Sequence, residues 1–177
     1  MAKIGIDVSQ LTYQNTGVAN YLGNLIEEMI KNKEHDYILF FSSLRRSIPP
    51  RLQEFSKSSN VTVVRKKLPP SVLHILWNVM HIMPIEKFLG SIDMFISSDW
   101  SEPPTRKAKK ATILYDLIVY KYPEETAKKI VFVQTKKLSW VQKESDIVFC
   151  ISESTKNDAK SILGISEAKL KVVLPGF

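Results

Sequence analysis

The strongest constraint on the fold is an alternation of short apolar runs with longer segments of helical periodicity. Between the first two runs, apolar residues from Val18 to Ile30 recur every three and four positions, as on one face of a helix. Strands that alternate with helices favour parallel pairing. The sequence therefore predicts an α/β fold with a Rossmann-like, doubly wound, mostly parallel sheet and helices on both faces. The seven runs with the length of buried strands span residues 4–8, 36–41, 61–64, 92–96, 111–115, 146–151 and 169–174.

Three further helices are expected downstream of the first. One runs from Val72 towards Leu89 with a kink or restart at Pro84, and one is capped by Ser152 or Ser154 and ends at Leu163. The third spans residues 124–145 and is expected to bury Ala127, Ile130, Val131, Leu138 and Val141. Residues 45–57 are expected to form a loop with at most a weak helical turn.

Length and composition favour one domain, spanning residues 1–177. The 25 basic and 18 acidic residues give a net charge of +7, which favours anionic partners without choosing among phosphate groups, nucleic acid and acidic membranes. The single cysteine, Cys150, lies in an apolar run, so we expect a buried thiol and no intrachain disulfide. With no signal peptide before the first strand, these features predict a cytoplasmic protein.

The sequence lacks several motifs that mark particular enzyme classes. It has no G-x-G-x-x-G dinucleotide fingerprint, no G-x-x-x-x-G-K-[ST] phosphate loop and no G-x-S-x-G nucleophile turn. Three histidines and one cysteine show no metal-ligand spacing. No cofactor and no metal are therefore expected.

The remaining candidates for function follow the predicted strands, where open α/β sheets bind their ligands. Asn15 or Thr16 can cap the first helix, and Gly17 can let the backbone approach a phosphate, although for one glycine alone a plain turn is the stronger interpretation. Trp100 can stack on a sugar or base while Asp99 accepts hydroxyl hydrogen bonds, and the alternative is an ordinary surface loop.

Two further loops follow the fifth and sixth strands. In Tyr115-Asp116, the carboxylate can orient a hydroxyl or simply cap the next turn. In Ser152-Glu153, helix capping alone explains the serine. Each signal is weak singly, but together they place polar groups at successive carboxyl ends of strands.

Four stretches, in this order along the chain, carry a resemblance to a known family. The stretches are Ile4–Asp7 with Thr16–Tyr21, Asp93–Ser97 with Pro103-Pro104, Tyr115–Ile118 with Tyr122–Glu124, and Ile151–Asp158 with Leu163–Ile165 and Lys171–Gly176. With them the sequence resembles the N-terminal domain of retaining GT-B glycosyltransferases of glycosyltransferase family 4, also called group 1. The third stretch is similar to the family's "H-D-L-I-P…P-E" segment, and the fourth is similar to "V-S-x-x-S-K-x-D…L-G-I…V-V-x-x-G".

The resemblance implies transfer of a sugar from a nucleotide sugar, which is a substrate, to a lipid-linked or polysaccharide acceptor in envelope glycan synthesis. It assigns Tyr115 and Asp116 to the catalytic part of the cleft. Acceptor binding falls to Asp99, Trp100, Ser152 and Glu153, and the donor phosphate faces Asn15, Thr16 and Gly17. The family's histidine before the aspartate is Tyr115 here, and many relatives have Gly and Arg where this chain has Ala19 and Asn20.

The family's second, C-terminal domain binds the donor, and its E-x₇-E motif has no counterpart here. We therefore expect the 177 residues to be the acceptor-side half of a longer enzyme, inactive alone. The alternative is a non-enzymatic Rossmann-like module that binds a small ligand or an anionic polymer. Nucleic-acid binding is not expected, because the basic residues are scattered and no recognised motif accompanies them.

Peripheral attachment to an anionic membrane is a further hypothesis. The basic residues of the predicted helix at 124–145 can face acidic lipids, and Phe132 and Trp140, which lie off its core stripe, can insert. A solvated basic surface is the equally weighted alternative. These basic residues are Lys128, Lys129, Lys136, Lys137 and Lys143, to which Arg65-Lys66-Lys67 and Arg106–Lys110 add two further runs.

Overall fold

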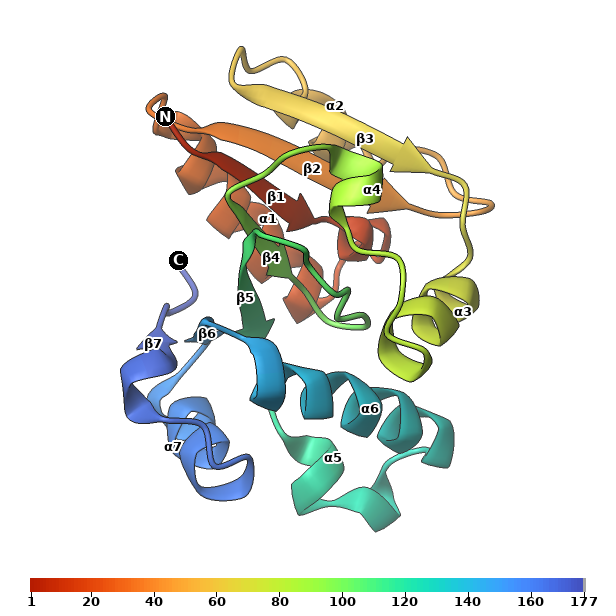
Figure 1. The fold of residues 1–177 in the computed structure, drawn as a ribbon, viewed down its shortest axis with the longest axis vertical. Coiled ribbons are helices and arrows are strands. Elements are labelled where there is room, and N and C mark those ends of the chain that lie inside the picture. Colours follow the sequence, from red (N-terminus) through yellow and green to blue (C-terminus); the bar gives the residue numbers. More distant parts are fainter. Residues whose placement is uncertain (177) are drawn as a thin grey trace.

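The computed structural model describes residues 1–176 and contains a seven-stranded, all-parallel sheet (Figure 1). The strand order is β3-β2-β1-β4-β5-β6-β7, which is a doubly wound, Rossmann-like arrangement. This confirms the fold class predicted from the alternating sequence. The strands are β1 (Lys3–Asp7), β2 (Asp36–Ser42), β3 (Val61–Lys66), β4 (Met94–Ser97), β5 (Lys109–Leu114), β6 (Ile147–Cys150) and β7 (Leu170–Val172).

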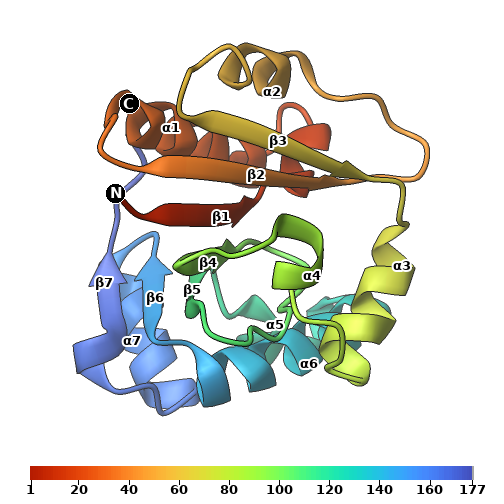
Figure 2. The same ribbon diagram turned by 45° about the horizontal axis from the view of Figure 1, so that its top comes forward.

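Helices cover both faces of the sheet (Figure 2). The α-helices are α1 (Gly17–Lys31), α2 (Pro50–Phe55), α3 (Pro70–Leu73), α4 (Glu86–Leu89), α5 (Ile118–Lys121), α6 (Lys128–Glu144) and α7 (Glu153–Ile162). A π-helix, η2 (His74–Val79), continues α3, and short 3₁₀ turns are η1 (Ser9–Thr12), η3 (Pro123–Glu125) and η4 (Glu167–Lys169).

The two-residue period of the strands divides the core between the faces. In β2, Leu39 packs with the buried side chains of α1 and α2, whereas Phe40 points to the other face. There its ring centroid lies 5.7 Å from that of Trp77 on η2. On the same face as α6, Val148 and Cys150 of β6 pack against α6 and α7. The expected burial of Cys150 is confirmed, and it raises the pKa of this thiol to about 11.

The reversal of strand order at β1 determines where a site can form. β1 pairs with β2 on one side, with Asp7 opposite Phe40, and with β4 on the other, with Ile6 opposite Ile96. Connections from β1 and β4 lead to opposite faces of the sheet, so a crevice opens where they diverge, beyond the carboxyl ends. The loops predicted to carry function all follow this edge.

The segment after β3 departs from the predicted single helix. The chain leaves the helical path after η2, where His81 and Met83 adopt positive φ angles of 50° and 67° just before Pro84. The indole N–H of buried Trp77 donates to the Met83 carbonyl at 3.0 Å and stabilises this reversal. A pattern of apolar spacing contains no information about this hydrogen bond or the turn that it closes.

The long helix α6 starts later than predicted, and its buried face differs. η3 occupies residues 123–125, so the helix begins at Lys128. Ala127 and Ile130, expected in the core, are exposed, whereas Leu138 and Val141 are buried as expected.

Residues 45–57, expected as a loop, contain α2, whose first residue is Pro50. Within residues 1–176, no helix has both the length and the apolar character needed to cross a membrane.

Gly5, at the centre of β1, is surrounded by side chains that leave no room for a Cβ atom. A Cβ there would lie 2.8 Å from Leu89 Cδ1 and 3.0 Å from Phe95 Cδ2. We expect Gly5→Val to lower the free energy of unfolding by about 1–3 kcal/mol, because the added methyl groups overpack this layer. Urea denaturation measures the change. The control is Gly17→Val, which has no atom within 4 Å of its Cβ and should change stability by no more than about 0.5 kcal/mol.

Candidate functional site

Two pockets open at the carboxyl edge of the sheet, one on each side of Trp100. The first, here called the switch-point pocket, has a volume of about 320 Å³ and lies beyond β1 and β2. The second, the β5 pocket, has a volume of about 190 Å³. The switch-point pocket is lined by Asp7, Ser9, Gln10, Thr12, Tyr13, Ser42, Ser43, Leu44, Arg45, Arg46, Pro69, Pro70, Leu73, Trp100 and Ser101. The β5 pocket is lined by Val18, Asp99, Trp100, Ile113, Leu114, Tyr115, Asp116, Ile118, Val119, Ile130, Gln134, Lys137 and Leu138.

A third, more open hollow adjoins the switch-point pocket and is here called the arginine groove. Arg45 and Arg46 line both, and Arg46 donates from Nη1 to the Thr12 carbonyl at 3.0 Å while lying over the Tyr13 ring. The other groove residues are Thr12, Tyr13, Gln14, Thr16, Ser47, Pro49 and Pro50. Two guanidinium groups at one edge favour an anionic ligand.

The loop after β4 is fixed from the helical side. Asn78 of η2 is 1% exposed, and its Nδ2 donates to the Trp100 carbonyl at 2.8 Å. The Asn78 Oδ1 accepts from the Glu102 backbone N–H at 2.9 Å. Because both groups of this side chain bind the same loop, Trp100 has a defined position between the two pockets.

A buried lysine lies beneath the same loop. Lys137 of α6 is 2% exposed, and its Nζ donates to the Ser98 carbonyl at 2.6 Å. Burial lowers the pKa of Lys137, an effect that Glu102, Asp99 and Asp7 oppose. The expectation that Lys137 faces lipid is therefore wrong, because its ammonium group is buried against the sheet edge and donates to the Ser98 carbonyl there.

Two carboxylates next to this lysine are also perturbed. Burial raises the pKa of Asp7 and of Asp99, and the charge of Lys137 acts in the opposite direction in both cases. The Asp99 Oδ1 accepts from Gln134 Nε2 at 3.2 Å. Perturbed carboxyl groups in a pocket are typical of functional sites, although structural ion clusters produce them as well.

Tyr115 and Asp116 both line the β5 pocket, as the sequence predicted for a shared cleft. The Tyr115 hydroxyl lies 3.2 Å from Ser98 Oγ, and its ring packs edge-on against Tyr21 at 5.7 Å between centroids. Burial raises the pKa of Tyr115, so the phenol remains protonated at neutral pH. Asp116 is exposed, and its Oδ1 accepts from the Ile118 N–H at 3.1 Å.

The glycine-containing loop lies at the same edge. Thr16, not Asn15, is the cap of α1, since its side chain accepts from the Ala19 N–H at 3.2 Å. Asn15 has a φ of 68°, and Thr16 lines the arginine groove. Gly17 is exposed with open space at its Cβ position, so internal packing does not require a glycine there.

The predicted residues after β6 lie outside the three hollows. Ser152 caps α7 by accepting from the Thr155 N–H at 3.1 Å, and Glu153 is exposed. Neither lines the switch-point pocket, the β5 pocket or the arginine groove. Their connection to the site is indirect, because Thr155 Oγ1 donates to the Tyr115 carbonyl at 3.1 Å.

Sequence reasoning missed several residues that line or support the pockets. Asp7 ends the first strand and was available to the strand-end argument, but Arg45 and Arg46 lie in a loop with no recognised motif. Lys137 carries no local signal at all, since it lies in a lysine-rich helix. Within residues 1–176, no three His, Cys, Asp or Glu side chains come together as metal ligands.

The chemistry of the hollows favours a polar, hydroxyl-rich ligand with a negative charge. Trp100, Pro69 and Pro70 give apolar walls on which a sugar ring can stack, beside hydrogen-bonding groups such as those of Asp7 and Ser9.

Comparison of the sequence with protein-family models gives no match, and comparison with curated proteins gives no significant match either.

We expect Lys137→Met to lower the free energy of unfolding by about 1–3 kcal/mol at pH 7, because the Ser98 carbonyl loses its donor and the nearby carboxylates lose a positive charge. The loss should be smaller near pH 4.5. Folding raises the pKa values of the Asp7 and Asp99 carboxyl groups, and loss of the lysine raises them further. At a pH between the unfolded and folded pKa values, the folded protein holds more protons than the unfolded chain. The free energy of unfolding therefore falls as the pH increases through this range.

Urea titrations at the two pH values measure this difference. Lys136→Met is the matched control, because Lys136 is the exposed neighbour of Lys137 and its loss should cost less than about 0.5 kcal/mol. An equal loss for Lys137→Met at both pH values would show that the lysine contributes packing rather than charge.

Proposed function

We propose that this chain forms the acceptor-binding half of a retaining GT-B glycosyltransferase of glycosyltransferase family 4. The observation that carries the proposal is the pair of pockets on either side of Trp100, one of which is lined by Tyr115 and Asp116. The Rossmann-like strand order and the ordered resemblance of four sequence stretches support it. In this proposal, the acceptor is a lipid-linked or polysaccharide precursor and the donor is a nucleotide sugar.

In the proposed site, Trp100 stacks on an acceptor sugar ring and Asp99 accepts hydrogen bonds from its hydroxyls. Asp116 orients the attacking hydroxyl, and its carboxylate is fixed by the Ile118 N–H, so only a small loss of rotamer freedom opposes its alignment. Tyr115 remains neutral and positions the Ser98 hydroxyl next to the same pocket.

The other reaction partner is proposed to come from a second domain that closes over this edge. Asn15, Thr16 and Gly17 form the exposed N-terminus of α1, where unpaired N–H groups and the helix dipole favour the departing diphosphate. Ser152 and Glu153 are proposed to contact acceptor beyond the pockets. Domain closure would exclude water and complete the site. A cytoplasmic location is part of the same proposal.

The acceptor assignment is tested by saturation-transfer NMR of the 177-residue chain with glucose, mannose, N-acetylglucosamine and their 1-phosphates. We expect weak binding of at least one sugar, reduced roughly tenfold by Trp100→Ala through the loss of ring stacking. Phe132→Ala removes an exposed aromatic ring that lines none of the three hollows and should leave binding unchanged. Binding that survives Trp100→Ala would contradict the assignment.

The two-domain part of the proposal makes a separate prediction. The chain alone should neither hydrolyse nor transfer from UDP-, GDP- or ADP-sugars, because the groups that stabilise the leaving diphosphate are proposed to lie in the other domain. Sensitive detection of released nucleoside diphosphate measures this. Turnover by the isolated chain would refute the proposed division of labour.

A second candidate, a non-enzymatic module for an anionic polymer, is favoured by the arginine groove. It predicts that polyphosphate or heparin binds at low salt and that Arg45→Gln with Arg46→Gln removes most of this binding. It also predicts that Trp100→Ala has no effect on binding, which distinguishes it from the acceptor assignment.

A further inference from the structure

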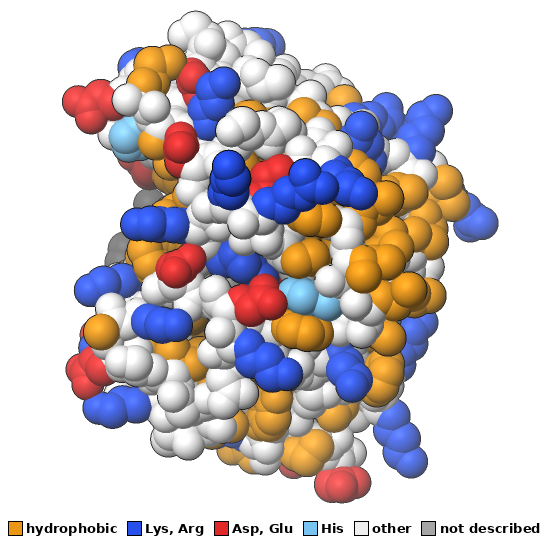
Figure 3. Space-filling view, in the orientation of Figure 1, with side chains coloured by type: hydrophobic (Ala, Val, Ile, Leu, Met, Phe, Trp, Pro, Cys, Tyr) orange, Lys and Arg blue, Asp and Glu red, His pale blue; other side chains and the backbone are white. Residues whose placement is uncertain are grey.

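A continuous apolar surface covers the outer side of η2 and the start of α6. The side chain of Met80 is 56% exposed, that of Phe132 is 53% exposed and that of Ile75 is 50% exposed. In Figure 3, hydrophobic side chains gather on the right-hand flank, where α3 and the N-terminal part of α6 lie in Figure 1. This surface, here called the apolar patch, consists of Val72, Ile75, Val79, Met80, Ile82, Met83 and Phe132.

The patch is continuous across two elements. The ring centroids of His74 on η2 and Phe132 on α6 are 5.9 Å apart, so the two helices are packed where the patch crosses between them. The helix of α3 and η2 is apolar on both sides, since Leu73 and Trp77 are buried on its inner side while Ile75 and Val79 are exposed on its outer side. Exposed apolar side chains gathered on the outer side of a helix are typical of a surface that contacts an apolar partner.

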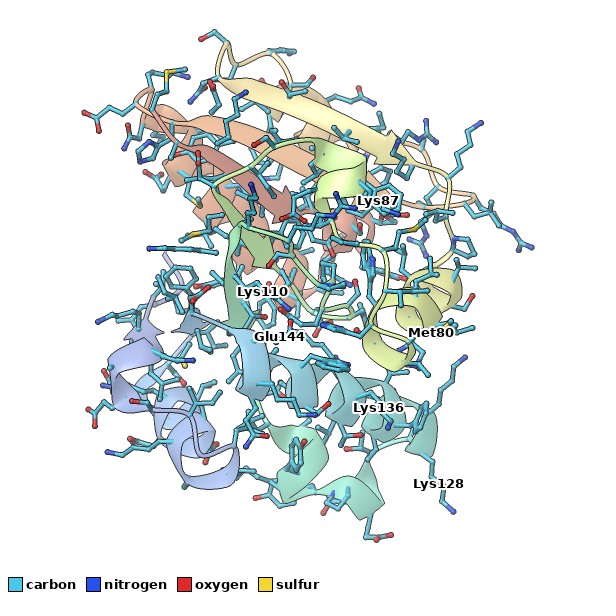
Figure 4. All side chains as sticks on the ribbon, in the orientation of Figure 1. Met80, Lys87, Lys110, Lys128, Lys136 and Glu144 are labelled. Carbon is cyan, nitrogen blue, oxygen red and sulfur yellow. The ribbon has the colours of Figure 1, made fainter. Side chains whose placement is uncertain are left out.

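The charges within the two segments that build the patch are all positive. Residues 61–85 and 126–143, which build it, contain no Asp or Glu. Figure 4 shows Met80 with Lys87 above it and Lys136 and Lys128 below it, and all three lysines are exposed. Further exposed cations in these two segments are Arg65, Lys67, Lys129 and Lys143.

Four acidic residues flank these two segments in the sequence: Glu86 and Glu144, which have partners, and Glu124 and Glu125, which are exposed just before α6. Glu86 Oε1 accepts from the backbone N–H groups of Arg106 and Lys107 at 2.7 and 3.1 Å. Glu144 pairs with Lys110 at 2.8 Å and with His81 at 2.9 Å. Because the exposed lysines and the arginine named above outnumber these carboxylates, the border of the patch carries a net positive charge.

We propose that the apolar patch and its lysine border dock this chain on an anionic lipid bilayer. The apolar side chains enter the boundary between head groups and acyl chains, and the lysines contact the lipid phosphates. Two copies of the chain meeting through this patch would oppose lysine to lysine, which disfavours self-association. Charge complementarity thus selects an acidic surface, and the exposed apolar centre of the patch selects lipid.

The position of the patch connects docking to the pockets. Pro69, Pro70 and Leu73, at the start of the same helical segment, form one wall of the switch-point pocket. Docking therefore brings the mouth of this pocket close to the lipid surface. The proposal does not depend on glycosyl transfer, because it concerns only the outer side of the helices.

The structure also changes which residues can insert. Trp140, expected to enter the membrane, is half-buried, and its ring is stacked on His81 at 3.6 Å between centroids. Its indole N–H donates to the Asn78 carbonyl at 2.8 Å. The expectation that Trp140 inserts into the membrane is therefore wrong. In the proposal, Phe132 and Met80 insert instead.

Vesicle flotation of the 177-residue chain tests the proposal. We expect binding to vesicles of phosphatidylcholine with 30% phosphatidylglycerol and little binding to phosphatidylcholine alone. Ile75→Ser with Met80→Ser should abolish binding. Lys128→Gln with Lys136→Gln should weaken it roughly tenfold or more, since each lysine near an acidic surface contributes a several-fold factor. Equal binding to both vesicle types would overturn the proposal.

The matched control removes the same charge elsewhere. Lys57 and Lys171 are exposed and lie in the turn after α2 and in β7, away from the patch (Figure 1). Lys57→Gln with Lys171→Gln should keep nearly all of the binding. A loss equal to that of the patch lysines would show that net charge alone is responsible and would overturn the proposal.

A second readout reports insertion directly. Because Cys150 is the sole cysteine and is buried, Met80→Cys offers one accessible thiol for an environment-sensitive fluorophore. Its emission should shift to the blue on acidic vesicles, whereas a fluorophore at Lys57→Cys should not shift. No shift at position 80, or a monomer–dimer equilibrium without lipid that Met80→Ser abolishes, would assign the patch to another partner.

Discussion

The parallel pairing of β1 with both β2 and β4 is the constraint on which the rest of the structure depends. It turns the chain to opposite faces of the sheet on either side of β1, and it directs the carboxyl ends of all strands to one edge. Asp7 ends β1, and Trp100 and Tyr115 follow β4 and β5, yet all three line adjoining pockets for this reason.

The loop after β4 depends in turn on two elements that cover one face. Lys137 of α6 binds the Ser98 carbonyl, and Asn78 of η2 binds both Trp100 and Glu102. The inner sides of these helices thus position the pockets, while their outer sides form the apolar patch. Any partner that contacts the patch would therefore lie one helix away from the candidate site.

Sequence reasoning identified the strands, the fold class and the pocket residues Asp99, Trp100, Tyr115 and Asp116, because strand ends are visible as local changes in composition. It did not identify the lysine and arginine residues of the site. Lys137 shares its helix with several exposed lysines, and only the packing of α6 on the sheet distinguishes it from them. Whether the four residues bind an acceptor stays a prediction.

The sequence by itself determined the alternation of strands and helices, and with it the single edge at which functional loops emerge. This follows because periodicity and capping are local properties of the chain. Only the tertiary structure decided which side chains of α6 and η2 are buried, which pockets flank Trp100 and where the apolar patch lies. These features depend on contacts between residues far apart in sequence, such as Lys137 with Ser98 and His74 with Phe132.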